Sequence, residues 1–237
     1  QRQMCIRDRV VYVGLTAIST VMLKLSGMNW FDALCHAMSA CATSGFSTKN
    51  ASVAYFDSPL IETVLILTMG IAGMHFGLIY ATVTGKRNNL FRSEVTRWYV
   101  GILLGCSVLI AVSLYAADIY PTLTSSFRHA AFQVGSIITT TGFSSCDFDL
   151  WPTLSKEILV MLMFVGACAG STGGGIKVSR LLLMGKTVGK ELKQALHPQV
   201  VAPVRMDGKV VNHETIRATN VFVAAYIFIF AASFFLI

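Results

Sequence analysis

Charged residues are scarce in this chain of 237 residues. They make up 13% of the sequence, whereas hydrophobic residues make up 54%, and the mean hydropathy is +0.63. This balance excludes an ordinary soluble domain and indicates an integral membrane protein. Lys and Arg outnumber Asp and Glu by 19 to 12, but the bases do not gather on one soluble segment, so the excess does not indicate a nucleic-acid partner.

The chain also lacks the residue spacings of common metal and catalytic sites. Its six cysteines include no CxxC pair and are interpreted as small apolar residues, with only Cys146 in a predicted outer loop. No set of His, Cys, Asp and Glu has metal-ligand spacing, and no context supports a Ser/His/Asp arrangement. We therefore expect no enzyme activity and no cofactor.

What the sequence does contain is a run of small hydroxyl residues around one glycine, at 139–145 (TTTGFSS). The apolar segment before it, residues 127–138, is too short to span a bilayer, which takes about 20 residues, and is typical of a re-entrant helix. Irregular backbone at membrane depth is tolerated only where protein buries it or where it lines an aqueous path. Because backbone carbonyls can replace the hydration shell of a cation, the run predicts one wall of a cation filter.

A second copy of the run supports this interpretation. Residues 43–48 (TSGFST) place Gly45 97 residues before Gly142, and the preceding short segments align at the same offset, with Ser39 against Ser136. Each copy is followed by an acid, an aromatic residue, a proline and a membrane-length apolar segment. The repeating unit is therefore a helix, a re-entrant half-helix, a filter loop and a second helix.

The rest of the chain fits two such units and the start of a third. We predict spanning helices at 10–25, 59–84, 98–119, 152–186 (interrupted by glycines) and 218–237, short re-entrant helices at 29–41 and 127–138, and no strands. The predicted divisions are a repeat at 10–84, a cytoplasmic link at 85–97, a repeat at 98–189, a cytoplasmic loop at 190–217 and a further helix at 218–237. Residues 1–9 match nothing downstream and are interpreted as a non-native leader.

Charge asymmetry predicts the orientation of the chain in the membrane. The links at 86–97 and 177–217 carry twelve bases against four acids and are assigned to the inside. The opposite side, which includes both filter copies, carries four bases against seven acids, so the filters enter from outside and have an acidic mouth. Each re-entrant helix then points its partly negative C-terminal end toward mid-membrane, which favours a cation.

These motifs resemble the TrkH, TrkG and KtrB family of potassium-uptake proteins. The resemblance rests on the filter copies, the run AGSTGGGIK at 169–177 and the Leu196-His197-Pro198 loop, and it covers residues 10–237. It implies an all-α membrane fold of four potassium-channel-like repeats, of which this chain holds the second, the third and the first helix of the fourth. It also implies potassium uptake across the bacterial cytoplasmic membrane by a multi-pass protein, a homodimer of full-length chains and a cytosolic nucleotide-binding ring subunit as partners.

The resemblance implies roles for individual residues. The filter carbonyls that bind K+ would come from Thr43, Ser44, Gly45 and Phe46 in the first copy and from Thr140, Thr141, Gly142 and Phe143 in the second. Ser47 and Ser144 stand where a potassium channel's filter has its second glycine, so K+ over Na+ selectivity is left open.

The glycine run leaves two interpretations open. A phosphate-binding loop needs Lys directly after the second Gly and Ser or Thr next, and here Ile176 and Val178 break that pattern. A close helix contact lined by glycine is one alternative. The other, which the resemblance implies, is an intramembrane gate formed by Gly170, Ser171, Thr172, Gly173, Gly174 and Gly175, with Lys177 at its inner end.

Two classes of function remain. The first is a channel-like conduit with filter and gate, and the second is a carrier with broken helices that couples K+ to H+ or Na+. The repeated outward filter loop favours the conduit. His75, within the predicted helix 59–84, is an intramembrane ionisable residue and either serves function or bonds a neighbouring helix.

Overall fold

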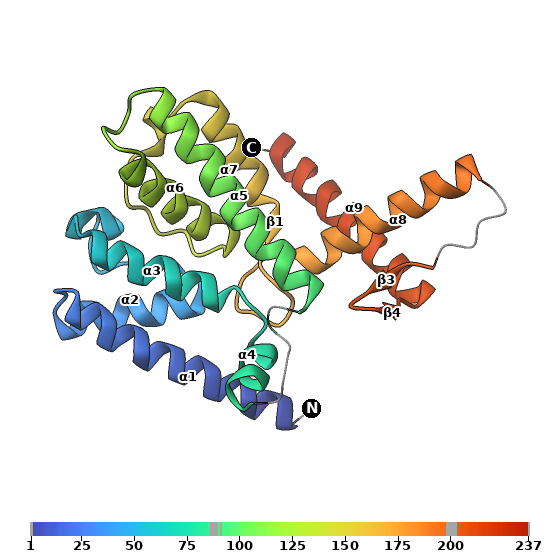
Figure 1. Ribbon diagram of the computed structural model, residues 1–237, viewed down its shortest axis with the longest axis horizontal. Helices are drawn as coiled ribbons and strands as arrows, with labels where there is room; N and C mark the ends of the chain where they lie inside the picture. The colour runs from blue at the N-terminus through green and yellow to red at the C-terminus, as the bar shows by residue number, and fades with distance from the viewer. Residues whose placement is uncertain (1, 86–89, 91, 198–202, 237) are drawn as a thin grey trace.

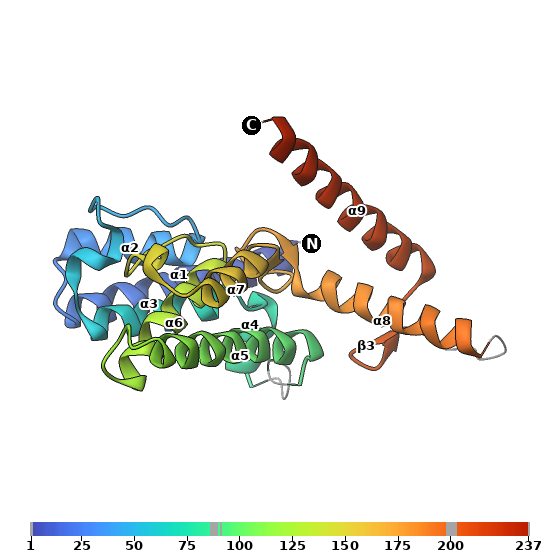
Figure 2. The ribbon, with the colours of Figure 1, turned by 90° about the horizontal axis from the view of Figure 1, so that it is seen from above.

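The computed structural model describes residues 2–85, 90, 92–197 and 203–236. Its helices form two neighbouring groups, α1 to α4 and α5 to α7, with α8 and α9 projecting to one side (Figure 1). Seen from above, α9 diverges from α8 (Figure 2). The two groups correspond to the two predicted repeats.

The first group contains α1 (Arg2–Leu25), α2 (Trp30–Ala42), α3 (Pro59–Ala72) and α4 (Phe76–Val83), with a short 3-10 turn, η1, at Ser52–Phe56. The side chain of Asn29 caps α2, and proline begins α3, where its missing N–H would have no partner inside the helix. Helix α1 starts at Arg2, so residues 2–9 continue the first predicted helix. Their interpretation as a leader stays a prediction.

The second group contains α5 (Glu94–Ala116), α6 (Leu123–Ile138) and α7 (Thr153–Met163), with a turn, η2, at Phe148–Leu150. Helix α8 (Val178–Leu196) follows the glycine run, and α9 (His213–Leu236) follows a short hairpin. Helix α8 extends seven residues into the predicted loop at 190–217, and α9 begins five residues before its predicted start. Pro198, part of the motif quoted above, lies outside the described residues, as do Lys86 and Arg87.

The prediction of one spanning helix over 59–84 is wrong. The chain breaks at Gly73-Met74-His75, and α3 and α4 meet there at an angle of 100°. Within the described residues, α5 and α9 are each long and apolar enough to cross a membrane, and the bent pair α3–α4 makes a third if it counts as one span.

The expectation that no strand would form is also wrong. The strands β1 (Val165–Gly166) and β2 (Ile176–Lys177) pair in parallel, and β3 (Arg205–Met206) and β4 (Lys209–Val210) form an antiparallel hairpin. Both pairs are only two residues long, so the fold remains a helical one. They matter because β1 and β2 join the two ends of the glycine run.

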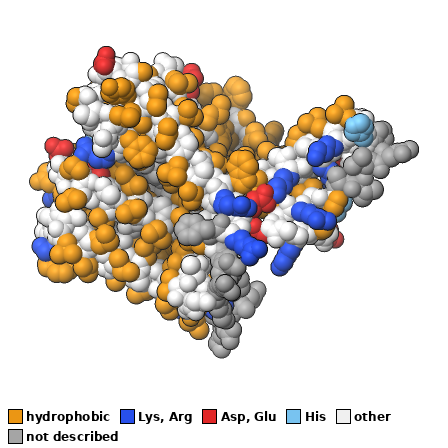
Figure 3. Space-filling model, viewed as in Figure 1, with side chains coloured by type: hydrophobic (Ala, Val, Ile, Leu, Met, Phe, Trp, Pro, Cys, Tyr) orange, Lys and Arg blue, Asp and Glu red, His pale blue; other side chains and the backbone are white. Residues whose placement is uncertain are grey.

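The helices pack around two apolar cores, and the first core includes residues of both repeats. The first core includes Leu23, Leu65 and Met69 together with Phe132 and Phe143 from the second repeat. The second core is built around Tyr99, Ile110 and Leu159. Lysine and arginine side chains gather over α8 and the hairpin, whereas hydrophobic side chains cover much of the helix groups (Figure 3).

Candidate functional site

The two re-entrant helices end in the same way, and each ending leads into a filter copy. At the end of α2, the amides of Thr43 and Ser44 donate to the carbonyls of Ala40 and Ser39, at 3.3 and 3.0 Å. At the end of α6, 97 residues on, Thr140 and Thr141 donate to Ile137 and Ser136, at 2.9 and 2.8 Å. This pair of bonds is the Schellman motif, which ends many helices and requires a residue of positive φ.

The residue of positive φ in both motifs is threonine, where glycine is usual. Thr43 has φ 51° and Thr140 has φ 57°. A β-branched residue in this region is strained, at about 1–3 kcal/mol, and such outliers gather at functional sites. The filter glycines, Gly45 and Gly142, also have positive φ, of 72° and 88°.

Positive φ therefore recurs at every second residue in each copy. Thr43 and Gly45 have positive φ and Ser44 between them does not, and Thr140, Thr141 and Gly142 repeat the pattern. The two predicted filter copies therefore share the same pattern of positive φ at equivalent positions.

The two filter copies lie against each other. The backbone carbonyl of Thr141 is so close to Gly45 that a Cβ on this glycine would overlap it. The amides of Val53 and Ala54, just after the first copy, both donate to the carbonyl of Ser144, at 3.1 and 3.2 Å. The structure thus brings together the two stretches that the sequence predicted to form one filter.

The two filter phenylalanines have opposite environments. Phe143 is 1% exposed, and its ring stacks on His36 of the first repeat with ring centres 5.7 Å apart. Phe46, its counterpart in the first copy, is 81% exposed. The ring of Phe143 therefore packs the second filter copy against α2, the short helix of the first repeat.

The glycine run forms a loop whose ends are joined. Strand β1 before it pairs with β2 after it, Val165 opposite Ile176 and Gly166 opposite Lys177. The ammonium group of Lys177 donates to the carbonyl of Gly173 and so closes the loop at its inner end.

The glycine loop touches the second filter copy. The amide of Gly174 donates to the hydroxyl of Thr140 at 2.7 Å. A Cβ on Gly173 would lie 3.0 Å from the carbonyl of Thr139. The loop therefore packs directly against the backbone that begins this filter copy.

The same loop fills the break between α3 and α4. The amide of Cys168 donates to the carbonyl of Gly73 at 3.0 Å, and the amide of Phe76 donates to the carbonyl of Gly170 at 3.2 Å. The carbonyls and amides that the break removes from helical bonding are thus paired with the loop. Gly170 has φ 79°, and a Cβ on it would lie 3.0 Å from the ring of His75, so only glycine fits there without strain.

Sequence reasoning missed this break, although a signal for it is present. Gly73 and His75 lie 97 residues before Gly170 and Thr172, in the same register as the filter copies. Both repeats thus interrupt the helix that follows the filter, the first by a sharp bend and the second by a long loop. His75 caps α4 and accepts a bond from the amide of Gly77 at 3.1 Å, so it serves its own chain segment rather than a neighbouring helix.

The whole described chain matches a known protein family. The family model TrkH, described as cation transport protein, matches residues 2–237. The chain belongs to the TrkH family.

Curated relatives and a solved structure agree with this assignment. The chain is 36% identical over 225 residues to the Trk system potassium uptake protein TrkH of Salmonella typhimurium, covering 94% of this chain and 47% of that protein. It is 38% identical to TrkH of Halomonas elongata, covering 93% of this chain and 46% of the relative. The crystal structure of the potassium transporter TrkH from Vibrio parahaemolyticus matches with a TM-score of 0.89 and 33% identity, over 94% of this chain and 48% of that one.

This TrkH-family chain spans about half the length of these relatives. The match to a membrane transporter of known structure confirms the predicted helical membrane fold. Within it, α2 and α6 both end at the filter copies, as the re-entrant interpretation requires. The partly negative C-terminal ends of both helices therefore point at the two predicted filter copies.

Proposed function

We propose that the full-length protein takes up potassium ions across the bacterial cytoplasmic membrane through a channel-like pore. The observation that carries the proposal is the alternating backbone at Thr43–Gly45 and Thr140–Gly142, repeated at one offset and held against each other. Rings of backbone carbonyls from repeated loops can replace the hydration shell of a cation. The names of the relatives, which are potassium uptake proteins, support K+ as the substrate.

In the proposed pore, the K+ ligands are the backbone carbonyls of the filter residues, with Phe46 and Phe143 completing the two copies. Ser47 and Ser144 each follow the Gly-Phe pair of their copy, at the position where a potassium channel's filter has its second glycine. Each copy therefore supplies one glycine where such a filter has two. The test is tracer uptake by the full-length chain in liposomes, with K+, Rb+ and Na+ compared. Uptake of K+ and Rb+ well above Na+ is expected, and equal uptake of all three would refute a selective carbonyl filter.

We further propose that the glycine loop, residues 170–175 with Lys177, is the gate. Its support is position, since the loop contacts the start of the second filter copy through Thr140 and fills the α3–α4 break. Its backbone can move because glycine adopts several conformations at little cost. Its ends cannot move far, because β1 and β2 pair.

Deleting residues 171–174 tests the gate. We expect ion flux to rise and to lose its dependence on a regulatory partner, because the deletion removes the amide that binds Thr140. Alanines in place of Gly173, Gly174 and Gly175 should instead lower flux. A deletion variant that accumulates normally, yet keeps the flux and regulation of the wild type, would reduce the loop to a packing feature.

A carrier that couples K+ to H+ or Na+ is the second candidate, and one observation favours it. The α3–α4 pair is bent by 100° at Gly73–His75, and broken helices are common in carriers. Flux measured across a range of voltages separates the two. A fixed ratio of K+ to a coupled ion at every voltage would favour the carrier, and flux that follows the K+ gradient alone would favour the conduit.

We also propose a cytosolic nucleotide-binding ring subunit and a second copy of the full-length chain as partners. The basic surface over α8 and the hairpin supports a docking role, and Lys190 and Lys193 both lie in the C-terminal half of α8. Such a surface attracts an acidic partner or anionic lipid headgroups. A multi-pass arrangement with this surface inside follows from the excess of bases there.

A further inference from the structure

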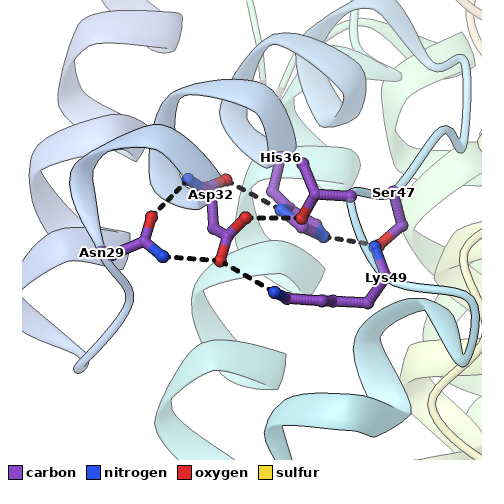
Figure 4. A network of polar contacts seen from close by, with 6 residues as sticks. Asn29, Asp32, His36, Ser47 and Lys49 are labelled. Atoms are coloured by element: carbon purple, nitrogen blue, oxygen red, sulfur yellow. Dashed lines mark hydrogen bonds and ion pairs between the residues drawn. The ribbon is translucent and has the colours of Figure 1, made fainter.

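A buried acid lies behind the first filter copy. Asp32, in the first turn of α2, is 3% exposed. One carboxylate oxygen accepts a bond from the hydroxyl of Thr48 at 2.5 Å, and the other accepts from the side-chain amide of Asn29 at 2.8 Å. The ammonium group of Lys49 lies 3.7 Å from the same oxygen (Figure 4).

His36 extends this network by one helical turn. Its Nδ1 lies 2.8 Å from the backbone carbonyl of Asp32, which can only accept, so Nδ1 carries a proton and donates. Its Nε2 lies 2.9 Å from the hydroxyl of Ser47. In the neutral ring, Nε2 is therefore the acceptor and Ser47 the donor.

The residues held by this network lie at the end of the first filter copy, directly after the four residues whose carbonyls are proposed to bind K+. Ser47, Thr48 and Lys49 are consecutive, and they come immediately after Phe46. The inner end of the same copy is fixed by the Schellman motif at Thr43. Asp32 and His36 thus fix the outer end, so one pore helix holds the filter copy at both ends.

The second filter copy is held by different contacts. At the same register, the positions of Asp32, His36 and Lys49 are taken by His129, Gln133 and Cys146, so no acid is present. The amide of Gln133 reaches the carbonyl of Cys146 only at 3.5 Å. Among the described residues, the buried acid beside α6 is Glu62 of α3, whose carboxylate lies 3.1 Å from the guanidinium of Arg128. A buried carboxylate that accepts from the end of a filter copy is therefore a feature of the first copy.

We propose that Asp32 is a specificity-determining positioning residue. With His36 it fixes the outer end of the first filter copy and thereby sets the preference for K+ over Na+. The inference rests on the proposed potassium filter. Hydrogen bonds to a buried carboxylate are about twice as strong as hydrogen bonds between neutral groups. They can therefore keep the filter carbonyls at the spacing that fits K+ and prevent them from closing around the smaller Na+.

The test is Asp32→Asn in the full-length chain, reconstituted in liposomes, with Asp149→Asn as the matched control. Asp149 is also an acid beside a filter copy, but it is exposed. If Asp32 acted only by attracting cations, both variants would lower K+ and Na+ uptake together. If it positions the filter, only Asp32→Asn lowers the ratio of K+ to Na+ uptake, by about tenfold if one charge-assisted bond is lost.

Two further variants keep the proposal testable if Asp32→Asn fails to accumulate. Thr48→Val removes one donor to the carboxylate and keeps its shape, and His36→Gln installs the residue found in the second copy. Both should lower the K+ to Na+ ratio while maximal K+ uptake changes less.

Unchanged ratios in correctly folded Asp32→Asn and Thr48→Val would overturn the proposal and leave the potassium filter standing. A wild-type chain that takes up no K+, or takes up K+ and Na+ equally, would overturn the proposed function itself. A ratio that falls equally in Asp149→Asn would show that charge, and not position, sets the preference, and this too would overturn the role of Asp32.

Discussion

The two filter glycines should differ in how much they resist substitution. Both have positive φ, so alanine at either position is strained. A Cβ on Gly142 would meet nothing within 4 Å, whereas a Cβ on Gly45 would overlap the backbone carbonyl of Thr141. The matched pair Gly45→Ala and Gly142→Ala therefore separates conformational strain from steric overlap.

The structure gives the size of each effect. Left-handed backbone costs about 1–2 kcal/mol for a residue with a Cβ, so Gly142→Ala should destabilise the protein by about that amount. Gly45→Ala adds overpacking against a backbone atom, which cannot rotate away and which typically costs about 1–3 kcal/mol more. The free energy of unfolding should consequently fall further in Gly45→Ala than in Gly142→Ala.

Unfolding of both variants in detergent, at matched protein concentration, measures the difference. The K+ to Na+ uptake ratio in liposomes reports the filter independently, and both variants should lower it because both redirect carbonyls. Equal destabilisation by the two variants, or a larger effect of Gly142→Ala, would refute the close approach of the two filter copies. An unchanged uptake ratio in both would refute the filter assignment.

Three further predictions follow from the described contacts. Thr140→Val removes the hydroxyl that accepts from Gly174, so ion flux should rise and its regulation weaken, as measured by tracer uptake at matched expression. Glutamates in place of Lys190 and Lys193 should weaken retention of the proposed ring subunit in a pull-down, most strongly at low salt, and equal retention at every ionic strength would exclude docking there. The pKa of Asp32 is lowered chiefly by the hydroxyl that donates to it, so its contribution to stability should be present at neutral pH and lost as the pH falls below about 4. The stability difference between wild type and Asp32→Asn, measured by unfolding from about pH 7 to pH 3, should therefore shrink in acid, and a difference that grows would contradict the predicted sign.

The repeated parts of the fold could be predicted from the sequence. One offset of 97 residues aligned the short helices, the filter glycines and the serines at Ser39 and Ser136, and the structure repeats their backbone bonds at that offset. The short helices were recognisable because their apolar length is too small for a bilayer. Their starts were less certain, since α6 begins four residues earlier than predicted, where Thr122 caps it.

The break between α3 and α4 could not be predicted from the composition of its own segment, and its signal in the sequence is the repeat offset that places Gly73 opposite Gly170. Residues 59–84 are apolar almost throughout, and no proline marks the interruption. The pattern of apolar residues does not reveal a bend whose unpaired backbone N–H and C=O groups are bonded to a loop about 100 residues away in the sequence. Cys168, Gly170 and Thr172 supply those partners, and only tertiary structure brings them to Ala72, Gly73 and Phe76.

The network at Asp32 was missed for a related reason. From the sequence, Asp32 was one of seven outer acids and was expected to attract cations from an acidic mouth. In the structure the carboxylate of Asp32 is buried and has three partners, so it holds its neighbours in place and does not face the solvent. No pattern in one sequence distinguishes an exposed acid from a buried one at the start of a short helix.

The pairing of β1 with β2 has a consequence for changes in the length of the glycine loop. Because Val165 lies opposite Ile176, the ends of the glycine loop are fixed independently of what lies between them. Lengthening a loop with fixed ends is cheap, since doubling its length costs about 0.6 kcal/mol in closure entropy. A change in the length of the loop is therefore compatible with α7 and α8 keeping their places, so deletion of residues 171–174 should alter the loop without displacing these helices.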